Sequence, residues 1–448
     1  MKRIALVLDS PKRDFYGIAA VAYWLIRNHK ARPIIVGTQN EITALVKYVP
    51  HLLVMPHLRF HRHELLVSYA KAQGTKIAVI PVEGFPKTDR LIAKSVLGLE
   101  KFRKNVDLLL TWGDYVASYC RDNAVAPGTV IKTTGSPRFD INTPAYNSWF
   151  SERKDFMGRL QLPWDRPLIV WFSCTAWANL PVSEEAFANT HSNKLRSTHL
   201  VGDDLDLMAL RRDDQKAFNY MTDLFSRFIR EHPDFNYVIK PHPFEPQEPY
   251  QSLKALSPNV RVIDTRIPVA EIVRHADIQV NWQCSTSLEG WMFDIKKKTI
   301  SIRTPGLELS EDFVPFVKGN DCVITYDDFV RRMHHYLDGG ALPDGLEQKR
   351  KDYIHNYAAK AGHSGEACAQ ALIEHLNGYP EPRRRWANFR YIAAKQIPHW
   401  IWHRRWVMMR RPPSDHKYFS PESFHLTIEK YNRLFSTTVS SKDYDLEV

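Results

Sequence analysis

The chain has 448 residues, of which 44% are hydrophobic and 25% are charged, and its formal net charge is +11. This composition excludes a wholly disordered chain and leaves room for two domains and an appendage. The positive charge favours acidic partners, namely nucleic acid, anionic lipid or phosphorylated substrates. The positions of the basic residues along the chain discriminate between these partners.

Cysteine usage and hydropathy bear on the compartment. The five cysteines are scattered without a C-x-x-C pair, so neither a disulfide framework nor a zinc cluster is indicated, and a reducing compartment fits best. The N-terminal sequence MKRIALVLDS has an apolar run too short for a signal peptide, and no run of about 18 apolar residues occurs. The sequence therefore predicts a cytoplasmic protein that is soluble or peripheral on a membrane.

Short β-branched apolar runs alternate with helix-length segments in the first third of the chain. Strands are expected at 4–8, 33–36, 77–82, 108–111 and 130–133, with a helix at 19–28. Such alternation predicts βαβ units and a parallel sheet with helices on both faces. We expect a Rossmann-like domain over 1–160, and its sequence thins into a polar linker at about 142–166.

A second series of the same kind follows. Strands are expected at 167–172, 236–239, 260–263, 278–281 and 299–302, and a helix at 346–376. The fold class is thus predicted as α/β, with a second Rossmann-like domain over 161–376 and an appendage over 377–448. Two such domains place the carboxyl ends of both sheets on one cleft, where open α/β sheets bind ligands. The polar insertion at 182–215 is either a functional loop or disordered.

The sequence IKPHP follows the predicted strand at 236–239. Pro241 and Pro243 stiffen the loop, so Lys240 and His242 should project from the carboxyl edge of the sheet. Lysine offers a point charge and imidazole a hydrogen-bond donor to phosphate, a pair that suits a nucleotide-sugar donor. A rigid turn with an incidental histidine is the alternative.

A run of hydroxyl residues follows the strand predicted at 278–281. Ser285, Thr286 and Ser287 would open a helix, where hydroxyls, free backbone N–H groups and the positive end of the helix dipole form an anion site. The same letters also read as a capping box from Thr286 to Glu289, which needs no ligand. Both interpretations can hold together.

Carboxylates at predicted strand ends are the candidates for catalysis. Glu83 follows the strand at 77–82 and is the first choice for a general base or nucleophile; Asp114 follows the next strand, and Asp140 the last one. Gly135 and Pro137 shape the loop that carries Arg138, a candidate donor contact, and Asp140. Capping or salt-bridged roles for Glu83, and a structural Arg138–Asp140 pair, remain open.

The order of these motifs resembles the bacterial surface carbohydrate biosynthesis proteins, which are similar to the Kdo transferases of capsule and lipopolysaccharide synthesis. The resemblance covers about residues 1–376 and rests on VEG at 82–84, TWGD at 111–114, TGSPRFD at 134–140, IKPHPFE at 239–245, ADIQVNWQCSTSLEG at 276–290 and GEACAQALIEHL at 365–376.

The resemblance implies a GT-B fold, no catalytic metal, no cofactor, and a CMP-activated sugar such as Kdo as donor. It implies that His242-Pro243 and the 285–287 hydroxyls hold the nucleotide, and Glu289 of the same motif is counted with them as a candidate contact of the nucleotide sugar. It places the catalytic carboxylate less firmly, so Asp203, Asp204 and Asp206 stand beside Glu83. KPHP-type loops also occur in polymerases that transfer glycerol phosphate from CDP-glycerol, which is the enzymatic alternative.

The segment 383–411 differs in kind, with nine Arg or Lys residues, no acid and four tryptophans. Tryptophan and arginine without acid suit the headgroup layer of an anionic membrane, and about 1 kcal/mol per basic residue would hold the protein there. The residues expected to contact lipid are Arg383, Arg384, Arg385, Trp386, Trp400, Trp402, Arg404, Arg405 and Trp406. An arm packed on the body is the alternative, and residues 417–448 should fold back.

These observations predict a glycosyltransferase of capsule or lipopolysaccharide synthesis at the inner face of the bacterial inner membrane. Its partners would be a nucleotide-sugar donor, a lipid-linked or oligosaccharide acceptor and the anionic membrane surface. No nucleic-acid partner is expected, because no recognised binding motif accompanies the basic residues. The rival from another class is a non-catalytic, membrane-tethered assembly protein with a degenerate GT-B fold.

Overall fold

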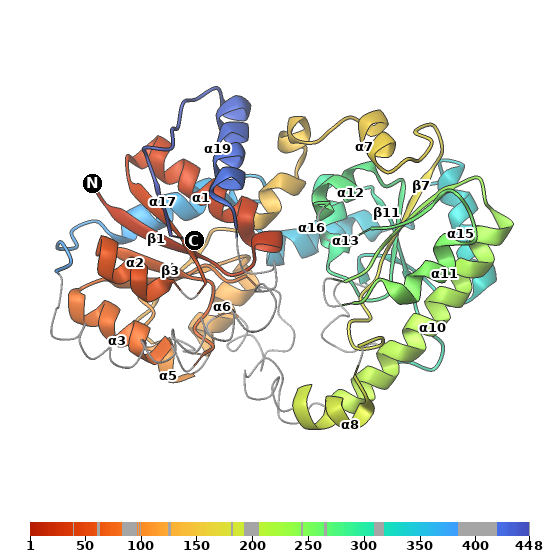
Figure 1. Cartoon of the computed structure of the whole chain (residues 1–448), viewed down its shortest axis with the longest axis horizontal. Coiled ribbons are helices and arrows are strands. Elements are labelled where there is room, and N and C mark those ends of the chain that lie inside the picture. Colours follow the sequence, from red (N-terminus) through yellow and green to blue (C-terminus); the bar gives the residue numbers. More distant parts are fainter. Residues whose placement is uncertain are drawn as a thin grey trace, which may run out of the picture. The chain divides into compact units, whose positions relative to one another are not determined.

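The computed structural model describes residues 1–38, 40–60, 63–82, 96, 98, 100–123, 127–180, 182–191, 206–242, 245–263, 267–308, 318–383 and 419–447. By its contacts the chain forms two compact units (Figure 1). Unit 1 combines Met1–Asp140 with His355–Val448, and unit 2 is Ile141–Ile354. The chain therefore leaves unit 1 once and returns to it, whereas the sequence-based division assigns consecutive stretches with boundaries at 160 and 376.

Unit 1 is built on a seven-stranded sheet in which every neighbouring pair is parallel. In sheet order the strands are β13 (Asp445–Glu447), β2 (Arg32–Gly37), β1 (Arg3–Leu8), β3 (Leu52–Met55), β4 (Lys76–Val79), β5 (Leu108–Thr111) and β6 (Val130–Thr133). The expected first strand and the strands at 108–111 and 130–133 are present. The strand expected at 77–82 ends at Val79, two residues before Pro81, which has no N–H for a ladder.

Helices cover both faces of this sheet (Figure 1). They are α1 (Pro11–His29), α2 (Glu41–Tyr48), α3 (His63–Gln73), α5 (Glu100–Arg103), α6 (Asp114–Asp122), α17 (Ser364–His375) and α19 (Pro421–Phe435). Alternate residues of the central strand, such as Ala5 and Val7, join one core with α2, α3, α5 and α6. Helix α1 packs instead against α17 and α19.

The end of the chain is part of unit 1. Tyr23 of α1 stacks on Tyr431 of α19, with ring centroids 5.1 Å apart, and its hydroxyl lies 2.5 Å from that of Thr437. Arg32 and Asp445 form a bidentate ion pair beside the β2–β13 pairing. The expectation that residues 417–448 fold back is therefore confirmed for 419–447.

Unit 2 has a six-stranded sheet that is also parallel throughout. Its order is β12 (Asp321–Val323), β11 (Lys298–Ile302), β10 (Ile278–Asn281), β7 (Leu168–Phe172), β8 (Asn236–Lys240) and β9 (Val260–Val262). Its helices are α7 (Arg153–Arg159), α8 (Glu184–Ala186), α10 (Leu207–Glu231), α11 (Gln251–Lys254), α12 (Val269–His275), α13 (Thr286–Phe293), α15 (Tyr326–Leu337) and α16 (Leu346–Tyr357). Short helical turns lie at Pro144–Trp149, Phe187–His191 and Glu248–Tyr250, and another, Pro137–Asn142, contains the boundary between the two units.

The two faces of this sheet have separate cores. Helices α10, α11 and α15 pack on the face that includes Trp171, and α7 and α12 pack on the face that includes Phe172. The predicted fold class, α/β with two Rossmann-like units, is therefore confirmed.

The single helix expected at 346–376 is two helices, α16 and α17. The chain turns between them, and Lys360 and Gly362 adopt positive φ angles of 56° and 89°. Glycine adopts this conformation without strain, which ends the helical path there.

Within the described ranges, no helix combines the length and apolar character needed to cross a membrane.

Arg350 of α16 has no exposed surface. Its guanidinium donates to the carbonyls of Gly319, Ile295 and Lys297 at 2.7–2.8 Å and to the Thr299 hydroxyl at 2.7 Å. Burial lowers the pKa of Arg350 to about 10. This one side chain thus joins α16 to the segments around β11 and β12.

Candidate functional site

In an open parallel sheet, ligands bind outside the carboxyl ends of the strands, where the strand order reverses. In unit 2 the chain runs from β7 to β8 and β9 on one side and then to β10, β11 and β12 on the other. The reversal therefore lies between β7 and β10. The loops that begin at Ser173, Pro241 and Trp282 emerge at this edge.

Lys240 and His242 both lie at this edge, as the sequence predicts. Lys240 ends β8 with only 5% of its surface exposed, and its Nζ lies 3.4 Å from the Pro241 carbonyl. His242 is half-buried; burial, and then the charge of Lys240, lower the pKa of its imidazole to about 4. The imidazole is therefore neutral at pH 7 and can donate one hydrogen bond. Pro243 lies outside the described residues.

Glu245 organises the loops after β7 and β8. Its carboxylate accepts the backbone N–H of Thr175 at 2.7 Å and that of His242 at 3.1 Å. It also accepts the Tyr250 hydroxyl at 2.5 Å, and Tyr250 lies 2.6 Å from the Ser173 hydroxyl. The carboxylate is buried, so these bonds act in a low-dielectric environment. Glu245 thus holds the backbone that carries His242.

We expect Glu245→Gln to lower the free energy of unfolding by about 2 kcal/mol, because one amide N–H₂ would face donors now bound by a carboxylate oxygen. Urea unfolding of the purified protein measures this loss. The control is Glu248→Gln, three residues further on and exposed, which should leave stability unchanged. Equal stability of the two variants would contradict the organising role of Glu245.

The loop after β10 leads into α13, and the capping box from Thr286 to Glu289 does not form. Ser285 is the N-cap residue and makes no side-chain capping bond, while the Thr286 hydroxyl donates to Cys284 Sγ at 3.1 Å. Both residues are partly exposed at the N-terminus of the helix. Their hydroxyls thus lie where an anion would meet the positive end of the helix dipole.

Ser287 and Glu289 are engaged elsewhere. Ser287 is fully buried, and its hydroxyl accepts amide N–H groups from Asn281 at 2.9 Å and Asn320 at 2.8 Å. Glu289 is 8% exposed and accepts the Asn142 amide at 3.0 Å. This geometry favours structural roles for both residues. Of the three hydroxyl residues predicted to contact an anion, Ser285 and Thr286 therefore remain candidates.

The candidate carboxylates of unit 1 differ in their surroundings. Asp114 is exposed at the first position of α6 and accepts the Thr133 hydroxyl at 2.5 Å. Asp140 has no exposed surface and accepts the backbone N–H groups of Gly362, Ser364 and Gly365 at 2.7–3.0 Å. Those groups surround the start of α17, so the geometry of Asp140 favours a structural cap.

The remaining sequence-predicted residues are Asp206, three other carboxylate candidates and the expected lipid contacts. Glu83, Asp203 and Asp204 lie outside the described residues, and so do the expected lipid contacts from Arg384 to Trp406. Asp206 caps α10, accepting the N–H groups of Met208 and Ala209 at 2.9 Å. The backbone N–H of Arg383 donates to the Gln73 carbonyl at 2.8 Å, which ties the start of the basic segment to α3.

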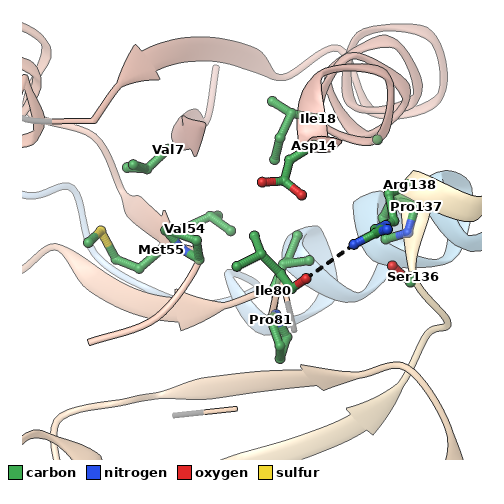
Figure 2. A pocket seen from close by; sticks show the side chains of 13 residues that line it. Val7, Asp14, Ile18, Val54, Met55, Ile80, Pro81, Ser136, Pro137 and Arg138 are labelled. Atoms are coloured by element: carbon green, nitrogen blue, oxygen red, sulfur yellow. Dashed lines mark hydrogen bonds between the residues drawn. The ribbon is translucent and has the colours of Figure 1, made fainter. Parts of the chain in front are cut away.

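A small pocket opens at the reversal point of the first sheet, between the ends of β1 and β3 (Figure 2). Val7, Val54 and Ile80 are among its apolar lining. Figure 2 shows the Asp14 carboxylate directed from α1 toward Ile80, with Arg138 beside Ser136 and Pro137.

Two charged side chains give this pocket its polarity. The Asp14 carboxylate accepts Nε of Arg13 at 2.9 Å and the backbone N–H of Ser10 at 3.2 Å, and burial raises its pKa although Arg13 and Arg138 oppose the shift. The Arg138 guanidinium lies 4.6 Å from the Phe139 ring centroid, and its Nη1 lies 3.5 Å from the Val82 carbonyl.

The fold has counterparts among solved structures. No protein-family model matches the chain, and no curated protein matches it. Among solved structures, S. aureus MnaA in a co-structure with UDP is 12% identical, covers 86% of this chain and 100% of its own, and has a TM-score of 0.53. The UDP-GlcNAc 2-epimerase from Neisseria meningitidis bound to UDP-GlcNAc is 11% identical, with coverages of 84% and 99% and a TM-score of 0.51. The fold is of the GT-B type.

Within this GT-B-type fold, Asp14 is the polar pocket residue that the sequence did not single out. The signal was present, because Asp14 follows the first strand in DSPKRD, five residues after Asp9. Gly17 adds to it: a Cβ at this position would lie 2.7 Å from the Arg138 backbone nitrogen, so the glycine admits the 136–138 loop against α1. Only the packing of α1 on that loop brings Asp14 and Arg138 together.

Proposed function

We propose that the protein is a glycosyltransferase of bacterial surface polysaccharide synthesis, transferring Kdo or a related sugar from a CMP-activated donor to a lipid-linked or oligosaccharide acceptor. The observation that carries this proposal is that Lys240 and His242, at the end of β8, and the N-terminus of α13, which follows β10, lie at the same carboxyl edge of the unit 2 sheet, on either side of β7. The GT-B-type fold supports it.

In this proposal the donor phosphate lies at the carboxyl edge of the second sheet. Lys240 supplies positive charge, the neutral His242 donates one hydrogen bond, and Ser285 and Thr286 add hydroxyl donors beside the α13 N–H groups. Buried cations bind phosphate strongly because water competes with them less. The Glu245 carboxylate keeps His242 in position.

Transfer to an acceptor hydroxyl needs a group that removes its proton. We propose Glu83 for this role, as the sequence does, and Asp14 as the second candidate. A carboxylate whose pKa is raised by burial accepts a proton more readily at neutral pH, which suits Asp14. The basic segment at 383–411 is proposed to hold the protein on the anionic inner face of the membrane.

Thermal unfolding against CMP, CDP, UDP and GDP tests the proposed donor. A nucleotide at about 100 times its Kd stabilises the folded state by about 2.7 kcal/mol, which corresponds to a Tm increase of roughly 5–10 °C. We expect this increase with CMP and its loss in His242→Ala, while His355→Ala, exposed on α16, keeps it.

Each other outcome has a defined meaning. CDP selectivity would favour transfer of glycerol phosphate, and a UDP preference would overturn the CMP-activated donor. An unchanged CMP response in His242→Ala would remove His242 from the site. A flat response to all four nucleotides would overturn the transferase and favour the assembly protein.

A further inference from the structure

Two cysteines that are distant in sequence lie together at the reversal point of unit 2. Strands β7 and β10 pair in parallel, with Phe172 opposite Asn281, and Cys174 and Cys284 follow just beyond these partners. Cys284 belongs to the core cluster on this face, and Cys174 packs against the same cluster. Each thiol shifts the pKa of the other, as expected for sulfur atoms that lie close together, and both cysteines are free.

The two sulfur atoms differ in their surroundings. Cys284 lies immediately before the N-cap of α13 and accepts the Thr286 hydroxyl at 3.1 Å. The Cys174 thiol and then Thr286 lower the pKa of Cys284 against the effect of burial, whereas the pKa of Cys174 is raised. A thiolate at a helix N-terminus is the usual form of a reactive cysteine. The position of Cys284 before the N-cap of α13 makes it the candidate nucleophile, with the partly exposed Cys174 as its partner.

The remaining cysteines have different environments. Burial raises the pKa of Cys120 to about 11 and that of Cys368 to about 12. Cys322 is an exposed residue, and desolvation of its thiol, followed by the charge of Asp321, raises its pKa to about 11. Raised pKa values leave little thiolate at neutral pH, so these three should react slowly with oxidants.

We propose that Cys174 and Cys284 form a reversible redox site that closes to a disulfide when the protein meets a peroxide. The Cys284 thiolate attacks a peroxide oxygen, breaking the O–O bond; with hydrogen peroxide this gives a sulfenic acid and hydroxide, which takes up a proton to become water. The Cys174 sulfur then attacks the sulfenic sulfur, and the second oxygen leaves as water. Two thiols and one hydrogen peroxide thus give one disulfide and two water molecules.

The disulfide would alter the edge proposed to bind phosphate, an effect that rests on the proposed function. Cys284 Sγ now accepts the Thr286 hydroxyl, and Thr286 begins α13. Bonding that sulfur to Cys174 ties the loop after β7 to the loop after β10. We expect the oxidised protein to lose most of the Tm increase that CMP gives the reduced protein.

Hydrogen peroxide treatment of the full chain tests the redox site. Free thiols are alkylated under denaturing conditions, and peptides are mapped by mass spectrometry before and after reduction. We expect loss of two of the five thiols, a linked peptide pair containing Cys174 and Cys284, and full recovery with dithiothreitol. In Cys174→Ser, a dimedone adduct on Cys284 should replace the disulfide, and Cys322→Ser should behave as wild type.

Absence of the linked pair in the wild-type protein, or faster oxidation of Cys120, Cys322 or Cys368, would overturn the proposal. Thiol mapping is independent of nucleotide binding. If the disulfide forms while no nucleotide stabilises the reduced protein, the redox site holds and the proposed function fails. If CMP stabilises the protein but no disulfide forms, the redox site fails alone.

Discussion

Arg350→Met is expected to lower the free energy of unfolding of unit 2 by about 3–5 kcal/mol. The guanidinium is fully buried and donates to three backbone carbonyls and one hydroxyl, and methionine fills similar space without any donor. Each buried acceptor left without a partner costs about 1–3 kcal/mol. Urea unfolding followed by tryptophan fluorescence measures the change, since Trp291 lies 5.4 Å from the guanidinium.

The matched control is Lys349→Met, which removes an exposed cation from the preceding position of the same helix. This variant should stay within about 0.5 kcal/mol of the wild type. A stability of Arg350→Met equal to that of Lys349→Met would mean that the buried hydrogen bonds contribute nothing net.

Asp140→Ala is expected to lower the free energy of unfolding by about 2 kcal/mol at pH 7, because three backbone N–H groups around the start of α17 lose their acceptor. The effect should also depend on pH. Burial raises the pKa of Asp140 from its ordinary value of 3.8 to about 6. The folded state therefore binds a proton more tightly than the unfolded state, and the stability from this protonation is lost as pH rises from about 4 to 6.

At about 1.4 kcal/mol per pKa unit, and with the unfolded carboxyl already partly protonated at pH 4, the difference between wild type and Asp140→Ala should grow by about 2.5 kcal/mol from pH 7 to pH 4. Chemical unfolding at both pH values measures it. Asp122→Ala, an exposed acid of the same unit, is the control and should show no such trend. A constant difference across this pH range would contradict the raised pKa, and full stability of Asp140→Ala would contradict the capping role.

Much of the fold can be predicted from local sequence, and the exceptions have physical causes. The buried central strands have continuous apolar sequences, so most of them are predicted at nearly their observed positions. Strand β13 is not, because its residues DLE are mostly polar and only pairing with β2 makes them a strand. Strand β3 is four residues long and lies in an apolar stretch that also suits a helix.

In the candidate site too, some features could be predicted from the local sequence and others could not. Lys240 and His242 could be predicted because prolines and a strand end fix their position along the chain. The hydrogen bond of Ser287 with Asn320 and those of Asp140 with the turn before α17 depend on residues distant in sequence. The Cys174–Cys284 pair likewise exists only because β7 and β10 are neighbours in the sheet. Side-chain partners across strands and helices are what a single sequence does not reveal.

Because unit 1 takes α17 and β13 from the far end of the chain, residues 1–140 leave the ribosome long before the partners that cover α1 and the edge of β2. Unit 2 is one continuous stretch and can fold during synthesis. Until α17 and β13 are synthesised, the apolar surface of α1 and the edge of β2 stay uncovered, and chaperones bind exposed apolar surface of this kind. We therefore expect translation that stops before residue 355 to yield a folded unit 2 joined to an aggregation-prone segment, which proteases would remove.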